Sequence, residues 1–210
     1  MASLELRLYL AASAGELEAL QACLAAGANP NRRRSNGEVP LHVAAMMGRV
    51  ACINALLEAG ADLEVEDTHG RRPLHDALIW LRSDCVEALL SHGASVEAGI
   101  KFGSTPLGLV AEDEEGADCV HALLAAGASA SDVDEFGETP VHIAAHSANV
   151  EGLRLMLLAQ PEAALLRNKK GDVLLALALA DPLDARTVEA ARCLLELGAL
   201  PPAVAEHDSC

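Results

Sequence analysis

The sequence predicts an all-α solenoid, in which about six helix–turn–helix repeats stack in a row and β-turn or hairpin fingers join them. Two series of glycines share one period of 33 or 34 residues. The composition agrees, because hydrophobic residues make up 51% of the chain and aromatic residues only 2%. A core without aromatic bulk suits closely packed small helices. The first glycine series is Gly37, Gly70, Gly103, Gly137 and Gly171, and the second is Gly27, Gly60, Gly93 and Gly127.

Each element of one unit follows from its residues. Pro40 suits the first position of a helix, which needs a fixed φ and no N–H. The alanine-rich helix after it is short, and a turn at Gly48 leads into a second helix. That helix carries an apolar stripe at Val50, Ile53, Leu56 and Leu57. Gly60 supplies the left-handed residue that ends it, and about ten residues cross over to the next proline.

Such a unit can bury its apolar stripe only against a copy of itself, so several units must stack. The copies are visible in Gly37-Glu-Val-Pro-Leu-His-Val-Ala-Ala and Gly137-Glu-Thr-Pro-Val-His-Ile-Ala-Ala. Leucine-rich stretches ending in Gly-Ala follow, as in Ala55-Leu-Leu-Glu-Ala-Gly-Ala. These phrases resemble the ankyrin repeat. The resemblance implies one domain over residues 1–200, an atypical cap at each end and a disordered tail at 201–210. The expected repeats span about 4–34, 35–67, 68–100, 101–134, 135–168 and 169–200.

Three departures from the repeat are expected to alter the stack locally. The fourth repeat has one extra residue, which falls in the turn at 112–116. The fifth has Gln160 where the terminating glycine belongs, so its second helix should end differently. The last repeat carries about four extra residues around 181–184.

The charge balance limits the class of partner. The formal net charge is −16 and the isoelectric point is near 4.7, a field that repels nucleic acid and anionic membranes. A protein with a basic or mixed-charge surface fits better, although acidity also serves solubility. No apolar run approaches the ~18 residues that span a bilayer, and the N-terminus lacks the pattern of a secretory signal. We expect a monomer in the cytoplasm or the nucleus.

Repeated histidines and cysteines are expected to be structural. His42, His75 and His142 share one repeat position, and repeats are spaced about 10 Å apart, too far for two histidines to share one metal. The resemblance gives this imidazole a hydrogen-bonding role between neighbouring turns. The cysteines at 52, 85 and 119 recur on the inner side of the second helix and should be small buried hydrophobes without disulfides. Cys193 is expected to behave similarly, and unpaired thiols indicate a reducing compartment.

No catalytic motif, cofactor motif or phosphate loop is present. Cys119 and His121 are two residues apart on a helix and point away from each other, which argues against a nucleophile–base pair. The acidic run 112–115 could chelate a cation, and a metal-dependent or enzymatic protein is therefore kept as an alternative. Like-charged loops are more often simply solvated.

The resemblance implies that turn tips and first helices form a concave surface for a protein partner. All three of the Trp and Phe residues, Trp80, Phe102 and Phe136, fall on this surface. Exposed aromatic and methionine side chains are typical of binding hot spots, although these rings could instead cover local backbone. The predicted contact residues are Met46, Met47, Thr68, His69, Arg71, Ile79, Trp80, Lys101, Phe102, Glu112, Asp113, Glu135, Phe136 and His146, with Ser35, Asn36, Glu38, Ser104, Glu138 and Ser147 at equivalent positions.

Two protein-binding hypotheses stand beside the metal-dependent or enzymatic alternative. The first is a non-catalytic adaptor, inhibitor or scaffold that binds a protein on the concave face. The second is a substrate-recognition subunit of a ubiquitin ligase, which needs a second surface for the ligase, and only about ten residues follow the last repeat. Asn31 stands where some members of the family carry a hydroxylated asparagine, although Pro30 precedes it here.

Overall fold

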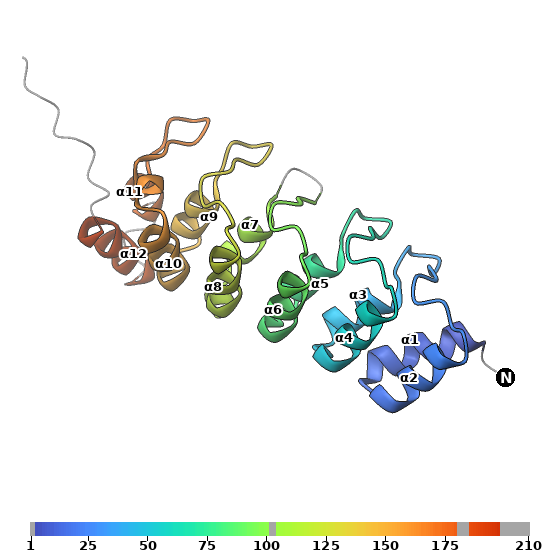
Figure 1. Ribbon diagram of the computed structural model, residues 1–210. Helices are drawn as coiled ribbons and strands as arrows, with labels where there is room; N and C mark the ends of the chain where they lie inside the picture. Colours follow the sequence, from blue (N-terminus) through green and yellow to red (C-terminus); the bar gives the residue numbers. More distant parts are fainter. Residues whose placement is uncertain (1–2, 101–103, 180–184, 198–210) are drawn as a thin grey trace, which may run out of the picture.

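The computed structural model describes residues 3–100, 104–179 and 185–197, and its helices stack as pairs in one row (Figure 1). The first and last described helices lie at opposite ends of the row. The first helices of successive pairs are α1 (Leu4–Ala14), α3 (Pro40–Met46), α5 (Pro73–Ile79), α7 (Pro106–Ala111), α9 (Pro140–His146) and α11 (Leu174–Ala178). The second helices are α2 (Leu17–Ala25), α4 (Val50–Glu58), α6 (Ser83–Ser91), α8 (Ala117–Ala125), α10 (Val150–Ala159) and α12 (Ala185–Glu196).

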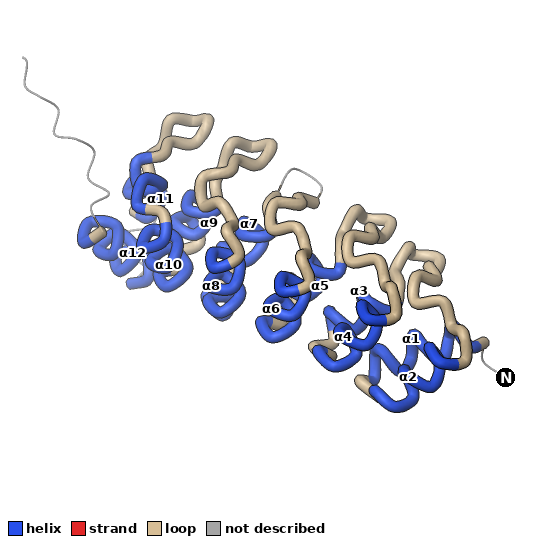
Figure 2. Tube along the Cα trace, viewed as in Figure 1, coloured by secondary structure: helices blue, strands red, loops and turns tan. Residues whose placement is uncertain are grey.

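The pairs form two layers of helices with fingers along one side. First helices contact the first helices of neighbouring pairs, and α4, α6, α8, α10 and α12 do the same in the second layer. The long loops that join successive pairs project, in their described parts, to one side of the row (Figure 2). The described residues contain no β-strand, only a single bridge between Arg167 and Val173. The predicted all-α solenoid is therefore confirmed.

The fingers are tight turns closed by backbone hydrogen bonds. In one finger the N–H of Arg34 donates to the carbonyl of Glu38 at 2.8 Å, and that of Gly37 donates to Arg34 at 3.0 Å. The same pattern recurs in the next finger between Asp67 and Arg71. Neighbouring fingers are also joined, since Thr68 donates its N–H to the Asn36 carbonyl at 3.1 Å. The predicted fingers are thus hydrogen-bonded turns rather than strands.

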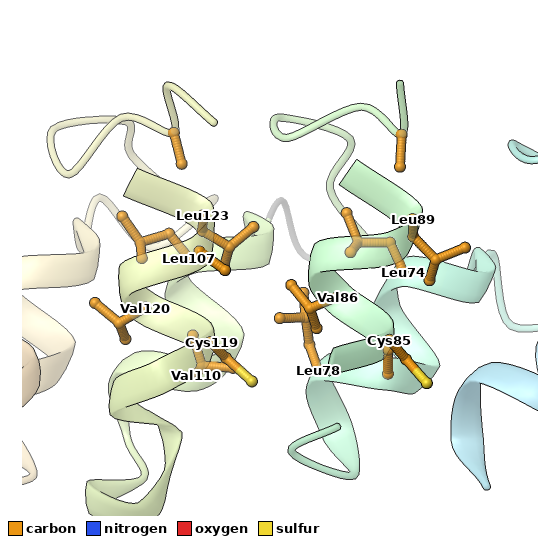
Figure 3. Packing of buried hydrophobic residues seen from close by; sticks show 14 of the residues in the cluster. Leu74, Leu78, Cys85, Val86, Leu89, Leu107, Val110, Cys119, Val120 and Leu123 are labelled. Carbon is orange, nitrogen blue, oxygen red and sulfur yellow. The ribbon is translucent and has the colours of Figure 1, made fainter. Parts of the chain in front are cut away.

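Small side chains allow the helix pairs to approach closely. Ala44, Ala77 and Ala144 are fully buried at matching positions of three first helices, and Ala111 is fully buried one residue farther along α7. Figure 3 shows leucine, valine and cysteine side chains of α5 and α6 packed toward one another and toward those of α7 and α8. The core is therefore continuous along the stack, as expected for repeats that share their interfaces.

The cysteines lie where the sequence places them. Those at 23, 52, 85, 119 and 193 are buried and free, and the last cysteine lies outside the described residues. Burial raises the pKa of the Cys85 and Cys119 thiols to about 11. These side chains consequently stay protonated near neutral pH and act as small hydrophobes.

The departures from the repeat have distinct structural outcomes. The extra residue of the fourth repeat is accommodated by the 3-10 turn η2 (Glu114–Gly116) before α8. Gln160 does not adopt the left-handed conformation of the glycines, and α10 is followed at once by the 3-10 helix η3 (Pro161–Leu165). Its side chain bonds the backbone of Ala128 and Ala130 at 2.8 and 2.9 Å, which joins two loops. The predicted insertion at 181–184 and the predicted tail at 201–210 lie outside the described residues.

Gly37 and Gly70 provide a matched test of how tightly the fingers stack. Their φ angles are +80° and +77°, so alanine meets the same backbone strain at both. A Cβ at Gly37 would lie 2.7 Å from the Thr68 nitrogen of the next finger, whereas one at Gly70 meets no atom of the described residues within 4 Å. We expect Gly70→Ala to cost roughly 1 kcal/mol and Gly37→Ala at least about 2 kcal/mol more, measured by urea denaturation. Equal losses would show that the fingers are not in contact.

Candidate interaction surface

Two of the repeated histidines each join the start of a first helix to the finger of the next repeat. Nδ1 of His42 accepts the Val39 N–H at 3.3 Å, and its Nε2 lies 3.0 Å from the Arg71 carbonyl in the next finger. His75 repeats the pattern, with Nδ1 2.9 Å from the Arg72 nitrogen and Nε2 2.5 Å from the Ala98 carbonyl. Because Nδ1 accepts, Nε2 carries the proton in a neutral ring. Burial lowers the pKa of both imidazoles, which favours that neutral form.

His142 departs from the expected role. Its Nδ1 lies 2.7 Å from the Thr139 hydroxyl oxygen, as part of the start of α9. Its Nε2 is buried, and no protein atom of the described residues lies within hydrogen-bonding geometry. The carbonyls of Leu166 and Asp172 lie in its vicinity, but burial still lowers the pKa of the ring. The prediction that all three imidazoles bond the next turn is therefore correct for two of them.

Several of the predicted contact side chains are exposed. The exposed fractions are 41% for Met47, 44% for Ile79, 52% for Trp80 and 64% for Phe136. Met47 and Trp80 occupy the same position, the C-cap, of the consecutive first helices α3 and α5. Thr68, His69, Glu112, Asp113, Glu135 and His146 are also exposed, whereas Lys101 and Phe102 lie outside the described residues.

Two predicted contact residues are engaged within the protein itself. Met46 is partly buried and packs against the core. Arg71 is held by Asp67, whose Oδ2 accepts from Nε at 3.0 Å and from a terminal nitrogen at 2.8 Å. This bidentate pair holds the guanidinium against its own finger, and the role of Arg71 in a partner contact stays a prediction.

A buried carboxyl beneath Arg71 was missed by the sequence analysis. Asp76 of α5 is 2% exposed and lies 3.5 Å from Arg71. Burial raises the pKa of Asp76 to about 7, and the attraction of Arg71 only partly opposes this. For Asp67, burial raises the pKa but hydrogen bonds from Arg71 and His69 lower it below its ordinary value. Arg71 therefore neutralises Asp67 well and Asp76 poorly.

At the N-terminal end of the surface, Tyr9 adds a second polar cluster. Its hydroxyl donates to Glu38 at 2.8 Å, and the Arg34 guanidinium lies 4.2 Å from the ring centroid. Burial and the bond to Glu38 raise the pKa of Tyr9 to about 12. The predicted position Glu38 is thus occupied by an internal contact.

Toward the C-terminal end, fingers and first helices enclose a hollow of about 560 Å³. Its lining includes the predicted contact residues Glu112, Phe136 and His146, together with the equivalent positions Ser104, Glu138 and Ser147. The remaining apolar part of the lining was not predicted from the sequence, and it consists of Ile100, Leu109, Ile143 and Leu177, with Gly108 of α7 also lining the hollow.

The sequence signal for this hollow is Gly108, which stands at the repeat position that holds a histidine in three other repeats. Pro106-Leu107-Gly108 aligns with Pro40-Leu41-His42 in the repeat. A Cβ built on Gly108 meets Ser104, Thr105 and Ile143 at 3.4 to 3.5 Å, an ordinary contact distance. The missing side chain therefore leaves room in the groove, and comparison of the repeats at this position would have located the hollow.

The described residues show neither metal-binding nor membrane-spanning features. No group of three or more His, Cys, Asp and Glu side chains among them is arranged to hold a metal ion, including the run at 112–115. None of the described helices has the length and apolar character needed to cross a bilayer.

Comparison with family models identifies the repeat. A model of ankyrin repeats in three copies matches residues 8–100, and a model of ankyrin repeats in many copies matches 114–157. The chain belongs to the ankyrin-repeat family. No curated protein matches it. Ankyrin repeats generally mediate protein–protein interaction, so the surface of this ankyrin stack is the place to seek its function.

Removal of the Asp76 charge should change how stability depends on pH. With a folded pKa near 7 against an ordinary 3.8, Asp76 favours folding most at low pH, and this contribution is lost as the pH rises through 7. We expect Asp76→Asn to gain on the order of 2 kcal/mol over the wild type between pH 5 and pH 8.

Urea midpoints at several pH values measure this difference. Glu87→Gln, at an exposed site on α6, controls for the change in net charge. A difference between Asp76→Asn and wild type that stays constant with pH would contradict the buried environment of this carboxyl.

Proposed function

We propose that this ankyrin-repeat chain is a non-catalytic adaptor, inhibitor or scaffold that binds a protein on the surface formed by its fingers and first helices. The observation that carries the proposal is the exposure of Trp80 and Phe136 on this surface. Aromatic residues are scarce in the chain, and large apolar groups in water mark sites of interaction.

The exposed apolar side chains are arranged along consecutive repeats. Leu10 is 53% exposed and lines a shallow depression with Met47. Ile79 and Trp80 follow on the next first helix. A partner that covers this row would bury aromatic and aliphatic area of the kind found at hot spots. Phe136 would form a separate contact farther along the stack.

The charges on the fingers favour a partner of mixed charge. Arg32, Arg33 and Arg34 lie in the first finger, while Glu135 and neighbouring acids lie in a later one. The Lys169 ammonium reaches the Glu135 carbonyl, so the later fingers also carry cations. Complementary charges would orient the partner and raise the association rate more than the affinity. We place this binding in the cytoplasm or nucleus, with the ankyrin chain as a monomer.

Replacement of Trp80 and Phe136 with alanine tests the proposal. Proteins captured by the purified wild-type chain from extracts of its source should be identified by mass spectrometry, and their dissociation constants measured by calorimetry. We expect the double variant Trp80→Ala, Phe136→Ala to bind at least about tenfold more weakly. Alanine at a hot spot typically removes about 2 kcal/mol or more of binding free energy. The thermal midpoint should change little.

Leu158→Ala is the matched control, since Leu158 is 63% exposed but lies on the second helix α10. It should leave binding within about twofold. Retained affinity in the double variant, or loss of affinity in the control alone, would reject this surface.

A further inference from the structure

We propose that the hollow between α7, α9 and α11 receives one large apolar side chain of an extended partner segment, next to an Arg or Lys of that segment. This inference rests on the proposed function and assigns the partner chemistry at one part of the surface. The hollow is bounded by Gly108 and Leu109 of α7, Ile143 and His146 of α9, and Leu177 of α11.

The hollow lies beside Gly108, where the fourth repeat lacks the histidine that the second, third and fifth repeats carry. At His42 and His75 the imidazole spans from the helix start to a carbonyl of the next finger, 3.0 and 2.5 Å away. Gly108 has no side chain to do this. Consequently the groove between the fourth and fifth repeats is both open and free of the histidine tie.

The floor of the hollow is apolar and large enough for a bulky side chain. Ile100, Leu109, Ile143 and Leu177 come from one finger and three first helices. A volume of about 560 Å³ falls within the range of sites that bury ligands. First helices α5, α3 and α1 follow α7 along the row (Figure 1), so an extended chain can run along this face while one side chain enters the hollow.

The rim favours a cation beside that apolar group. Three carboxyl side chains line the hollow, Glu112, Asp134 and Glu138, against one ammonium at Lys170. Asp134 uses Oδ1 for the N–H groups of Phe136 and Glu138, and Glu138 uses Oε1 for Asn168. Glu112 is exposed at the rim, and the whole chain has a formal net charge of −16. An arginine or lysine next to the apolar anchor would face this excess of negative charge.

A buried imidazole offers the segment a polar contact as well. His142 lines the hollow, and its Nε2 makes no hydrogen bond to the described residues. With Nδ1 bonded to Thr139 at the start of α9, Nε2 is the ring atom left for a ligand. An extended segment presents a backbone carbonyl or amide at every residue, which could pair with this nitrogen.

A displayed library of short random peptides, selected on the full-length folded chain, tests the inference. We expect enrichment of peptides in which a Leu, Ile or Phe adjoins an Arg or Lys. Enriched peptides are then synthesised with a fluorophore, and their affinities for the variants are measured by polarisation. Gly108→His should weaken binding at least about tenfold, because the imidazole fills the hollow as it does in two other repeats.

Two matched pairs of variants make the result specific. Gly108→Ala adds only a Cβ at ordinary contact distance and should keep affinity within about threefold. Gly108→His should also raise the thermal midpoint, so its loss of binding cannot come from misfolding. Glu112→Lys should weaken binding about fivefold, whereas Glu115→Lys, an equal charge change outside the hollow, should have less than a twofold effect.

Absence of enriched peptides, a consensus without a cation, or full affinity in Gly108→His would each overturn the inference. Peptides that ignore Gly108→His but lose affinity with Trp80→Ala would place the contact elsewhere and leave the proposed function standing. Failure of the captured proteins to depend on either surface would instead reject the proposed function.

Discussion

Each helix pair in this chain is too thin to bury its apolar side alone, so the contact between neighbouring pairs holds the whole structure together. The alanines at 44, 77, 111 and 144 are fully buried, which lets first helices approach closely. Each buried leucine adds about 1.5–3 kcal/mol of hydrophobic stabilisation. The shared interfaces fix where the next finger lies, and the functional surface is a consequence of that stacking.

Single residues that depart from the repeat pattern make the surface differ from one repeat to the next. Gly108 in place of histidine opens a hollow, and Asp76 stands where Val43 and Ile143 occupy other repeats. Leu81 takes a left-handed φ of 50° where Gly48 is found one repeat earlier. Such strained or polar substitutions are disfavoured by the fold itself. They lie on or beside the first helices, where a partner would make contact.

The sequence predicted the fold well because the repeat signals are local and redundant. Gly60 ends a helix at a φ of +84°, and Pro40 begins one, as the spacing indicates. The exposure of Trp80 also followed from its repeat position. The environments of Arg71 and Asp76 could not be predicted, because they depend on how the finger folds back on the start of its own helix, which brings Arg71 between Asp67 and Asp76. The repeat position of His142 likewise gave no sign that its buried Nε2 makes no hydrogen bond to the described residues.

Site-specific photocrosslinking tests most directly whether a partner covers the surface of fingers and first helices. A benzoylphenylalanine introduced at Trp80, Phe136 or Leu158 would report, in extracts of the source, which face of the ankyrin stack a partner covers. If the partner binds there, discrete protein adducts are expected from the positions of Trp80 and Phe136 and none from that of Leu158. Adducts only from Leu158, or equal adducts from all three positions, would contradict it.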